Sequence, residues 1–64
     1  MGIEYEYLNE AEVSRLTKRA LSTLRNDRFK RQGIPYVKVG RSVRYSKEDV
    51  IGFMEKRKIQ TESI

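Results

Sequence analysis

The sequence predicts a small α+β domain, mostly helical, with two short helices, a two-stranded β-hairpin and a C-terminal helix. Helix-capping patterns at Asn9 and Ser46 mark two helix starts. Residues 36–45 alternate between apolar and polar side chains, as strands do. The 64 residues include no cysteine and no histidine, so apolar packing and local capping have to hold the fold. We expect a core over residues 7–58 and a flexible tail over residues 59–64.

The first helix is predicted to begin after Asn9. Asparagine is a strong N-cap, and Glu12 occupies the third helical position, where its side chain can bond back to the N–H of the cap. Leu8 before the cap and Val13 at the fourth position form a hydrophobic staple. We expect this helix to end at Leu16 or the next residue, and to bury Leu8, Val13 and Leu16.

A second helical pattern follows after a break at residues 17–19. Placing residues at 100° intervals gives an apolar side, made of Ala20, Leu21 and Leu24. The opposite side is polar and consists of Arg19, Ser22 and Asn26, with Thr23 and Arg25 at its margins. We expect this helix to end within residues 28–31, because glycine and proline follow in the loop over residues 33–35. Two short helices separated by about three residues form a helix-turn-helix pattern.

The alternating segment after the second helix predicts a hairpin with a definite register. If Val39 lies opposite Val43 and Val37 opposite Tyr45, a three-residue loop closes the hairpin and all four apolar residues share one face. A two-residue loop would set valine against arginine and mix the faces, which the two-residue periodicity of strands disfavours. We therefore predict the three-residue loop.

In this register the loop is Gly40–Ser42, Lys38 lies opposite Arg44 on the outer face, and Arg41 is at the tip. Directly opposed like charges destabilise a sheet by roughly 0.2–1 kcal/mol. We interpret these cations as a site for an anion, because the second helix carries a similar excess of positive charge. The alternative is that long, solvated side chains simply splay apart.

The third helix is predicted to begin after Ser46, with Asp49 completing a variant of the capping box and the preceding tyrosine packing onto Val50. Its apolar face is expected to close the core, and is made of Val50, Ile51, Phe53 and Met54. Gly52 lies inside this helix and costs about 1 kcal/mol relative to alanine, unless something packs closely against it. The basic cluster at residues 56–58 complements the negative end of the helix dipole. We interpret this cluster as capping and solubility first, and nucleic-acid contact second.

The distribution of charge says more than its total. The chain has a net charge of +5 and a pI of about 9.8, a balance that ribosomal proteins and membrane-surface helices share. From Arg15 to Arg44 there are ten basic residues and a single acid, Asp27, which makes +9 for this segment. The two flanks together carry −4. The middle of the chain is therefore suited to meet a polyanion.

Several classes of function lack the residues they need. Without cysteine or histidine, and without paired carboxylates, the sequence offers no nucleophile with a base. It contains no phosphate-binding glycine loop and no cluster of metal ligands. We predict a binding module over residues 1–64, neither enzyme nor metalloprotein, with no cofactor. No apolar run approaches the roughly 20 residues of a membrane helix, and nothing resembles a signal peptide, so we expect a cytoplasmic protein without a membrane partner.

The helix-turn-helix pattern and the basic hairpin together indicate a winged helix-turn-helix that binds DNA. The second helix can enter the major groove, which is about 12 Å wide. There Arg19 could pair with guanine and Asn26 with adenine, while Ser22 and Thr23 suit bases or phosphates. Arg25 and Arg28, at the sides of the helix, suit backbone phosphates. The wing would place three cations along the backbone or in the minor groove, namely Lys38, Arg41 and Arg44.

Three segments resemble the small excisionase-like and AlpA-like DNA-binding proteins, within the winged-helix superfamily that includes the MerR regulators. They are TKRALSTLRNDR at 17–28, GIPYVKVGRSVRY at 33–45 and EDVI at 48–51. The likeness spans about residues 7–57, and the middle segment is its most specific part. It implies a winged helix-turn-helix that acts as an excision directionality factor, bending DNA and helping an integrase, or as a small transcriptional regulator.

The resemblance also assigns positions. It implies a recognition helix reading DNA with Arg19, Ser22, Thr23, Arg25 and Asn26, and a wing contact at Arg41. Lys18 stands where the family's turn commonly has glycine, and an L-residue with positive φ costs about 1 kcal/mol. Either the turn differs slightly, or Lys18 is kept for a phosphate contact. Arg19 replaces a residue that is often aliphatic in the family, so the alternative to reading a base is partial burial of its stem; we favour the DNA contact. The candidate DNA-binding residues are Lys18, Arg19, Ser22, Thr23, Arg25, Asn26, Arg28, Lys38, Arg41 and Arg44.

Double-stranded DNA is the expected partner, with an integrase, a recombinase or neighbouring copies on DNA as further partners. We expect a monomer in solution. An alternative is a protein-interaction adaptor whose basic face docks an acidic partner. The polar outer side of the second helix favours DNA over this alternative, since interface cores prefer aromatic residues and methionine. RNA binding is less favoured, because Tyr36 and Tyr45 fit a core better than a base-stacking platform.

Overall fold

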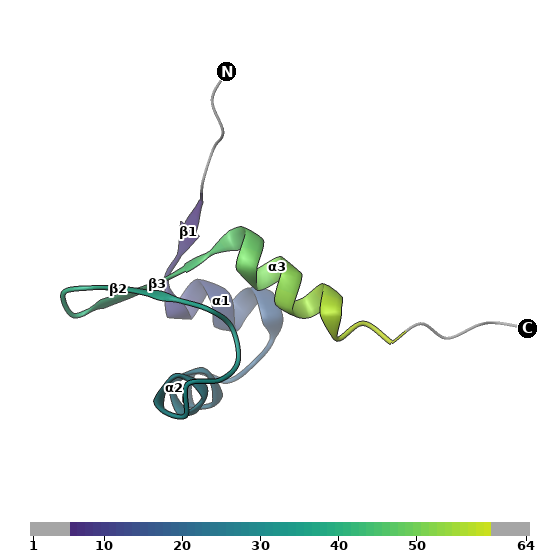
Figure 1. Cartoon of the computed structure of the whole chain (residues 1–64), viewed down its shortest axis with the longest axis horizontal. Helices are drawn as coiled ribbons and strands as arrows, with labels where there is room; N and C mark the ends of the chain where they lie inside the picture. Colours follow the sequence, from purple (N-terminus) through teal and green to yellow (C-terminus); the bar gives the residue numbers. More distant parts are fainter. Residues whose placement is uncertain (1–5, 60–64) are drawn as a thin grey trace, which may run out of the picture.

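The structure is a computed structural model that describes residues 6–59 (Figure 1). Its elements in chain order are β1 (Tyr7–Leu8), α1 (Glu10–Thr17), α2 (Leu21–Phe29), β2 (Val37–Val39), β3 (Ser42–Ser46) and α3 (Lys47–Lys56). The three predicted helices and the hairpin are all present, and they form a winged helix-turn-helix. The predicted flexible tail falls, apart from Ile59, outside the described residues.

The sheet has one strand more than the sequence analysis predicts. β1 pairs antiparallel with β3, so that the strand order is β1-β3-β2. Leu8 lies opposite Tyr45, and the N–H of Lys47 donates to the carbonyl of Glu6 at 2.9 Å. A strand of two residues is too short to show an alternating pattern, which is why the sequence does not reveal it. β1 ties the chain preceding α1 to the chain preceding α3.

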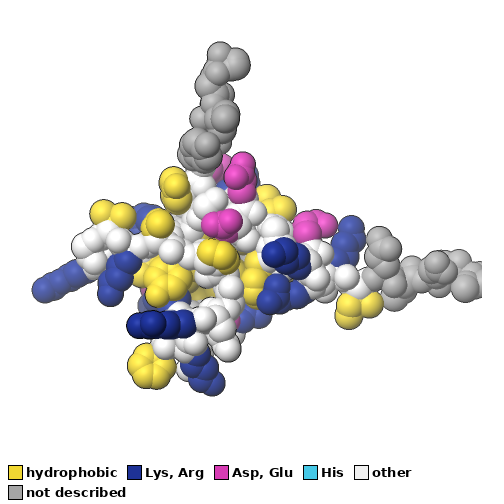
Figure 2. Space-filling view, viewed as in Figure 1, with side chains coloured by type: hydrophobic (Ala, Val, Ile, Leu, Met, Phe, Trp, Pro, Cys, Tyr) yellow, Lys and Arg dark blue, Asp and Glu magenta, His cyan; other side chains and the backbone are white. Residues whose placement is uncertain are grey.

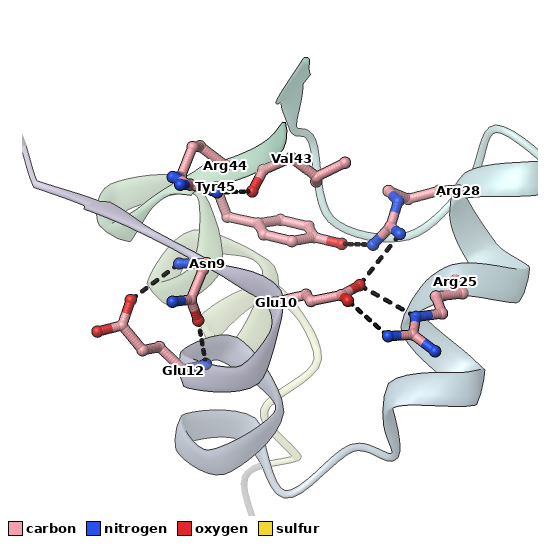
Figure 3. A network of polar contacts seen from close by, with 8 residues as sticks. All are labelled: Asn9, Glu10, Glu12, Arg25, Arg28, Val43, Arg44 and Tyr45. Atoms are coloured by element: carbon pink, nitrogen blue, oxygen red, sulfur yellow. Dashed lines mark hydrogen bonds and ion pairs between the residues drawn. The ribbon is translucent and has the colours of Figure 1, made fainter. Parts of the chain in front are cut away.

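α1 begins as predicted, with a complete capping box at Asn9. The side chain of Asn9 accepts from the N–H of Glu12 at 2.8 Å, and the carboxylate of Glu12 accepts from the N–H of Asn9 at 2.9 Å (Figure 3). The prediction for Leu16 is wrong, since this side chain is 53% exposed. Thr17 is buried in its place, because it lies one turn after the buried Val13 and its hydroxyl donates to the Val13 carbonyl at 2.7 Å.

The turn between α1 and α2 contains a residue in the left-handed conformation. Lys18 has φ 62° and ψ 24°, so lysine adopts the backbone conformation that glycine would adopt more easily. α2 then starts one residue later than the apolar pattern predicts. Ala20 is its N-cap and is exposed, which corrects its assignment to the buried side. Leu24 is buried, and Leu21 is partly buried against the core.

α2 ends in a Schellman motif, with Arg31 as its left-handed residue at φ 57°. The N–H of Arg31 donates to the carbonyl of Arg28 at 3.0 Å, and the N–H of Gln32 donates to the carbonyl of Asp27 at 2.9 Å. These two bonds satisfy carbonyls that the helix leaves without a partner. The motif turns the chain out of α2 and towards the hairpin.

The hairpin takes the register that the sequence analysis rejects. Val37 lies opposite Arg44, Lys38 opposite Val43 and Val39 opposite Ser42, so the loop has two residues. Glycine with positive φ at the first loop position is typical of two-residue hairpin turns, and Gly40 has a φ of 61°.

Burial explains why the alternation of apolar residues misleads here. The hairpin projects away from the helices (Figure 1), and Val37 and Val39 are 46% and 67% exposed. The two-residue periodicity determines register only where one face is buried, and these valines are not. Lys38 and Arg44 therefore lie on opposite faces, and the predicted pair of directly opposed cations does not exist.

α3 closes the core with only part of its predicted apolar face. The hydroxyl of Ser46 caps the helix by accepting from the N–H of Asp49 at 3.4 Å. Val50 and Phe53 are buried, whereas Ile51 and Met54 are 46% and 43% exposed, which corrects their assignment to the core. α3 packs mainly against α1 and β3, so only a narrow stripe of the helix is covered. The buried apolar residues are Leu8, Val13, Leu24, Ile34, Tyr45, Val50 and Phe53.

Candidate nucleic-acid interface

α2 and the wing, by which we mean the hairpin of β2 and β3, border a groove of about 390 Å³. Its lining consists of Arg25, Arg28, Phe29, Tyr36, Lys38, Arg41 and Val43. Figure 2 shows dark-blue Lys and Arg side chains over the hairpin tip and over α2, on the same side of the molecule. Among the residues that the structure describes, no carboxylate lines the groove. This surface is suited to an anion, and it joins the two elements that the sequence analysis assigned to DNA.

The outward side of α2 is exposed as predicted. The side chains of Ser22, Thr23 and Asn26 are all exposed, and none takes part in a side-chain hydrogen bond within residues 6–59. Side chains with unused donors and acceptors on a helix can meet base edges or phosphates. Lys18, in the turn before α2, is also exposed, next to the N-terminal end of this helix.

Arg19 lies elsewhere than the sequence analysis expected for a base-reading residue. Its guanidinium donates to the carboxylate of Asp27 at 2.6 Å and lies 5.5 Å from the centroid of the Phe53 ring. The Arg19 side chain is 31% exposed, and its Nε is buried with no hydrogen-bond partner in the described part of the chain. Arg19 therefore links the start of α2 to its last turn and to α3. The structure does not bring it together with Ser22 and Asn26.

Two arginines of α2 are held by one carboxylate from α1. Arg25 binds Glu10 through both Nε and Nη2, at 3.2 Å and 2.7 Å, and Arg28 binds Glu10 at 3.1 Å (Figure 3). Arg28 also donates to the hydroxyl of Tyr45 at 2.6 Å, and its guanidinium lies 5.8 Å from the centroid of the Tyr36 ring. The Glu10 carboxylate thus fixes the direction of both guanidinium groups relative to α1, and the Tyr45 hydroxyl fixes that of Arg28 relative to β3.

In the sequence, Glu10 stands out only as one of the acidic residues of the N-terminal flank. It lies 15 residues before Arg25, so no local pattern connects the two. The side chain of Glu10 is 27% exposed. Its hydrogen bonds from Arg25 lower the pKa of the Glu10 carboxyl below its ordinary value, burial partly opposes this, and the bond from Arg28 lowers it further.

The lowered pKa of Glu10 predicts a pH dependence of stability. A depressed pKa in the folded state means that the ion pairs stabilise the fold above the ordinary carboxyl pKa, about 4.3, and that this contribution is lost as pH falls through the folded pKa. We expect Glu10→Gln to destabilise the domain at pH 7 by about 1 kcal/mol, since the pairs are partly solvated. Urea unfolding at pH 7 and at pH 3 measures this, and the difference between the two proteins should shrink at pH 3.

Glu48→Gln is the matched control, because Glu48 also lies in the first turn of its helix and no ion pair involves it within the part of the chain that the structure describes. It separates the effect of the helix dipole from that of the arginine pairs. If Glu48→Gln lost as much stability as Glu10→Gln, the ion pairs of Glu10 with Arg25 and Arg28 would not be the cause.

The three predicted wing cations are divided between two faces. Lys38 and Arg41 line the groove, with Arg41 in the two-residue loop. Arg44 lies on the other face of the hairpin, where its guanidinium donates to the carbonyl of Val43 at 2.8 Å (Figure 3). Only Lys38 and Arg41 therefore face the same space as α2.

The fold and the basic surface define a winged helix-turn-helix module, a class of domain that binds DNA and is typically non-enzymatic. The family model described as "Helix-turn-helix domain" matches residues 7–58. The chain therefore belongs to this family. The comparison with curated proteins found no match, and neither did the comparison with solved structures. Within residues 6–59, no helix has the length and apolar character needed to span a bilayer.

Proposed function

We propose that this chain binds double-stranded DNA with sequence preference, as an excision directionality factor or a small transcriptional regulator. α2 enters the major groove, and the wing lies on the adjacent backbone or in the minor groove. The observation that carries the proposal is the groove between α2 and the wing, which among residues 6–59 is lined by four cations and by no carboxylate. The resemblance to excisionase-like proteins supports the narrower roles, which share this docking surface.

Within this proposal the residues have different tasks. Ser22, Thr23 and Asn26 face the bases, while Arg25 and Arg28 are held by Glu10 in directions that suit phosphates. Lys18, Lys38 and Arg41 add phosphate contacts from the turn and the wing, Arg44 lies at the edge of the interface on the wing's other face, and Arg19 supports α2 from within. A module of this size covers only about 600–1,000 Å² of interface. Useful affinity therefore needs repeated sites, neighbouring copies or a recombinase on the same DNA.

Fluorescence anisotropy across a salt series tests the proposal. The probes are labelled random duplex, single-stranded DNA and polyglutamate as an acidic polymer without bases. We expect preference for duplex, with log K falling against log salt at a slope of about −4 to −5 for roughly five neutralised phosphates. Equal binding to all three polymers would overturn the proposal and favour an adaptor that docks acidic partners.

Two variants of the wing provide a matched comparison, because each removes one arginine from β3 or its loop. Arg41→Gln is expected to reduce the salt slope by about 0.9, since Arg41 lines the groove. Arg44 lies on the other face of the hairpin, so Arg44→Gln should reduce the salt slope by less. Asn26→Ala should leave affinity for random duplex nearly unchanged, but the sites recovered by selection should show a less specific consensus. Equal effects of the two arginine variants would contradict the placement of DNA in the groove.

The bend angle of bound DNA addresses the narrower roles. Circularly permuted fragments carrying the selected site report this angle through their gel mobility. A strong bend supports an excision factor that brings distant integrase sites together, because bending permits contacts that straight DNA does not. A straight complex at a promoter supports a regulator.

A further inference from the structure

Phe29, in the last turn of α2, is 86% exposed. In a domain with a small core, an aromatic ring left in solvent contributes nothing to folding. A single exposed apolar residue is ordinary on a protein surface, so exposure alone assigns no role. The location of Phe29 is what distinguishes it, because its ring lines the groove between α2 and the wing.

The groove presents two kinds of side chain. The apolar surface comes from Phe29, Tyr36 and Val43. The positive charge comes from Arg25, Arg28, Lys38 and Arg41. Neither Lys38 nor Arg41 belongs to an ion pair among the residues that the structure describes. An occupant that matches this lining has to offer anionic and apolar groups in close succession. A sugar-phosphate strand has this composition, because phosphates alternate with deoxyribose rings.

The proposed docking of α2 and the wing on the duplex leads to the same occupant. A strand of the duplex separates the major groove from the minor groove. If α2 enters one groove and the wing reaches the other, this strand passes between α2 and the wing. We propose that Phe29 packs its ring against a deoxyribose of that strand, while Arg25, Lys38 and Arg41 bind the flanking phosphates. This inference rests on the proposed function and adds a sequence-independent apolar contact to it.

The experiment compares Phe29→Ala with Ile59→Ala in the full chain. Ile59 is 84% exposed and does not line the groove, so it controls for the loss of an exposed apolar side chain. We expect Phe29→Ala to bind random duplex about tenfold more weakly, as for a side chain buried in an interface. The slope of log K against log salt should stay the same, because no phosphate contact is lost. Its melting temperature should match that of the unmodified chain, and Ile59→Ala should bind normally.

Two further readouts separate a sugar contact from other roles of the ring. If the ring contacts a sugar, Phe29→Ala weakens binding equally on A·T-rich and G·C-rich duplexes, and Phe29→Leu retains most of the affinity. A ring inserted between bases would unstack them, which 2-aminopurine placed along the duplex reports as increased fluorescence. Such an increase that depends on Phe29 would overturn the proposal, as would normal DNA binding by Phe29→Ala.

Failure of this inference can be told apart from failure of the proposed function. If the unmodified chain binds duplex with a steep salt dependence and Phe29→Ala binds equally well, only the sugar contact is wrong. If Phe29→Ala binds DNA normally but abolishes self-association or capture of a second protein, Phe29 belongs to a protein interface instead. If the unmodified chain does not prefer duplex, both proposals fall together.

Discussion

Leu24→Ala is expected to destabilise the domain by about 2–5 kcal/mol. Leu24 is 2% exposed and is the one residue of α2 that is fully buried. Truncating it removes apolar contacts and leaves a cavity between α2 and the rest of the core. A chain of this size has only about 3–5 kcal/mol of stability from its core, so much of the protein should be unfolded at 37 °C. Circular dichroism during urea unfolding measures the loss.

Leu16→Ala is the matched control in the neighbouring helix. The same atoms are removed, but Leu16 is 53% exposed, so we expect a change of about 0.5 kcal/mol or less. DNA binding should follow the same order, because α2 is oriented through Leu24. Equal destabilisation by the two substitutions would show that α2 does not dock through Leu24.

Gly33→Ala is expected to cost about 2–4 kcal/mol, through two separate effects. Gly33 has a φ of 85°, a conformation that alanine adopts only under strain. An added Cβ would also lie 2.8 Å from Oδ2 and 2.9 Å from Cβ of Asp27. Asp27 would have to move, and its 2.6 Å ion pair with Arg19 would be disturbed. Urea unfolding measures the total cost.

A double-mutant cycle separates the backbone strain from the steric clash. In the background of Asp27→Gly, the three atoms nearest to the new methyl group are all gone. Gly33→Ala should then cost only about 1 kcal/mol, which is the contribution of the positive φ. An equal cost in both backgrounds would show that Asp27 yields freely and that strain alone accounts for the loss.

The sequence predicts best where the interactions are local. The starts of α1 and α3 follow from Asn9 with Glu12 and from Ser46 with Asp49, because a cap and its partner lie three residues apart. The hairpin itself is also predicted, but its register is not. The prediction assumed a buried face for Val37, and whether a strand face is buried depends on how far the hairpin projects from the core.

Within the candidate interface too, local features could be predicted, whereas contacts between distant segments could not. The exposed outer side of α2 follows from helical periodicity, so the positions of Ser22 and Asn26 could be predicted. The inward direction of Arg19 could not, because it depends on Phe53 from a distant part of the chain. Glu10 was missed for the same reason, since its partners are brought to it by the packing of α1 on α2. Charge counted along the chain shows which segment is basic, but not which cations are already paired.

The position of β2 in the sheet bears on how this protein behaves at high concentration. β2 is an outer strand, and a bare strand edge with exposed valines can pair with a second chain and begin aggregation. Two features oppose such pairing. The strand has only three residues, and its central residue is Lys38, so a second copy approaching edge to edge meets a like charge in the middle of a short ladder. The lysine that faces the groove thereby also helps to keep the protein from forming fibrils.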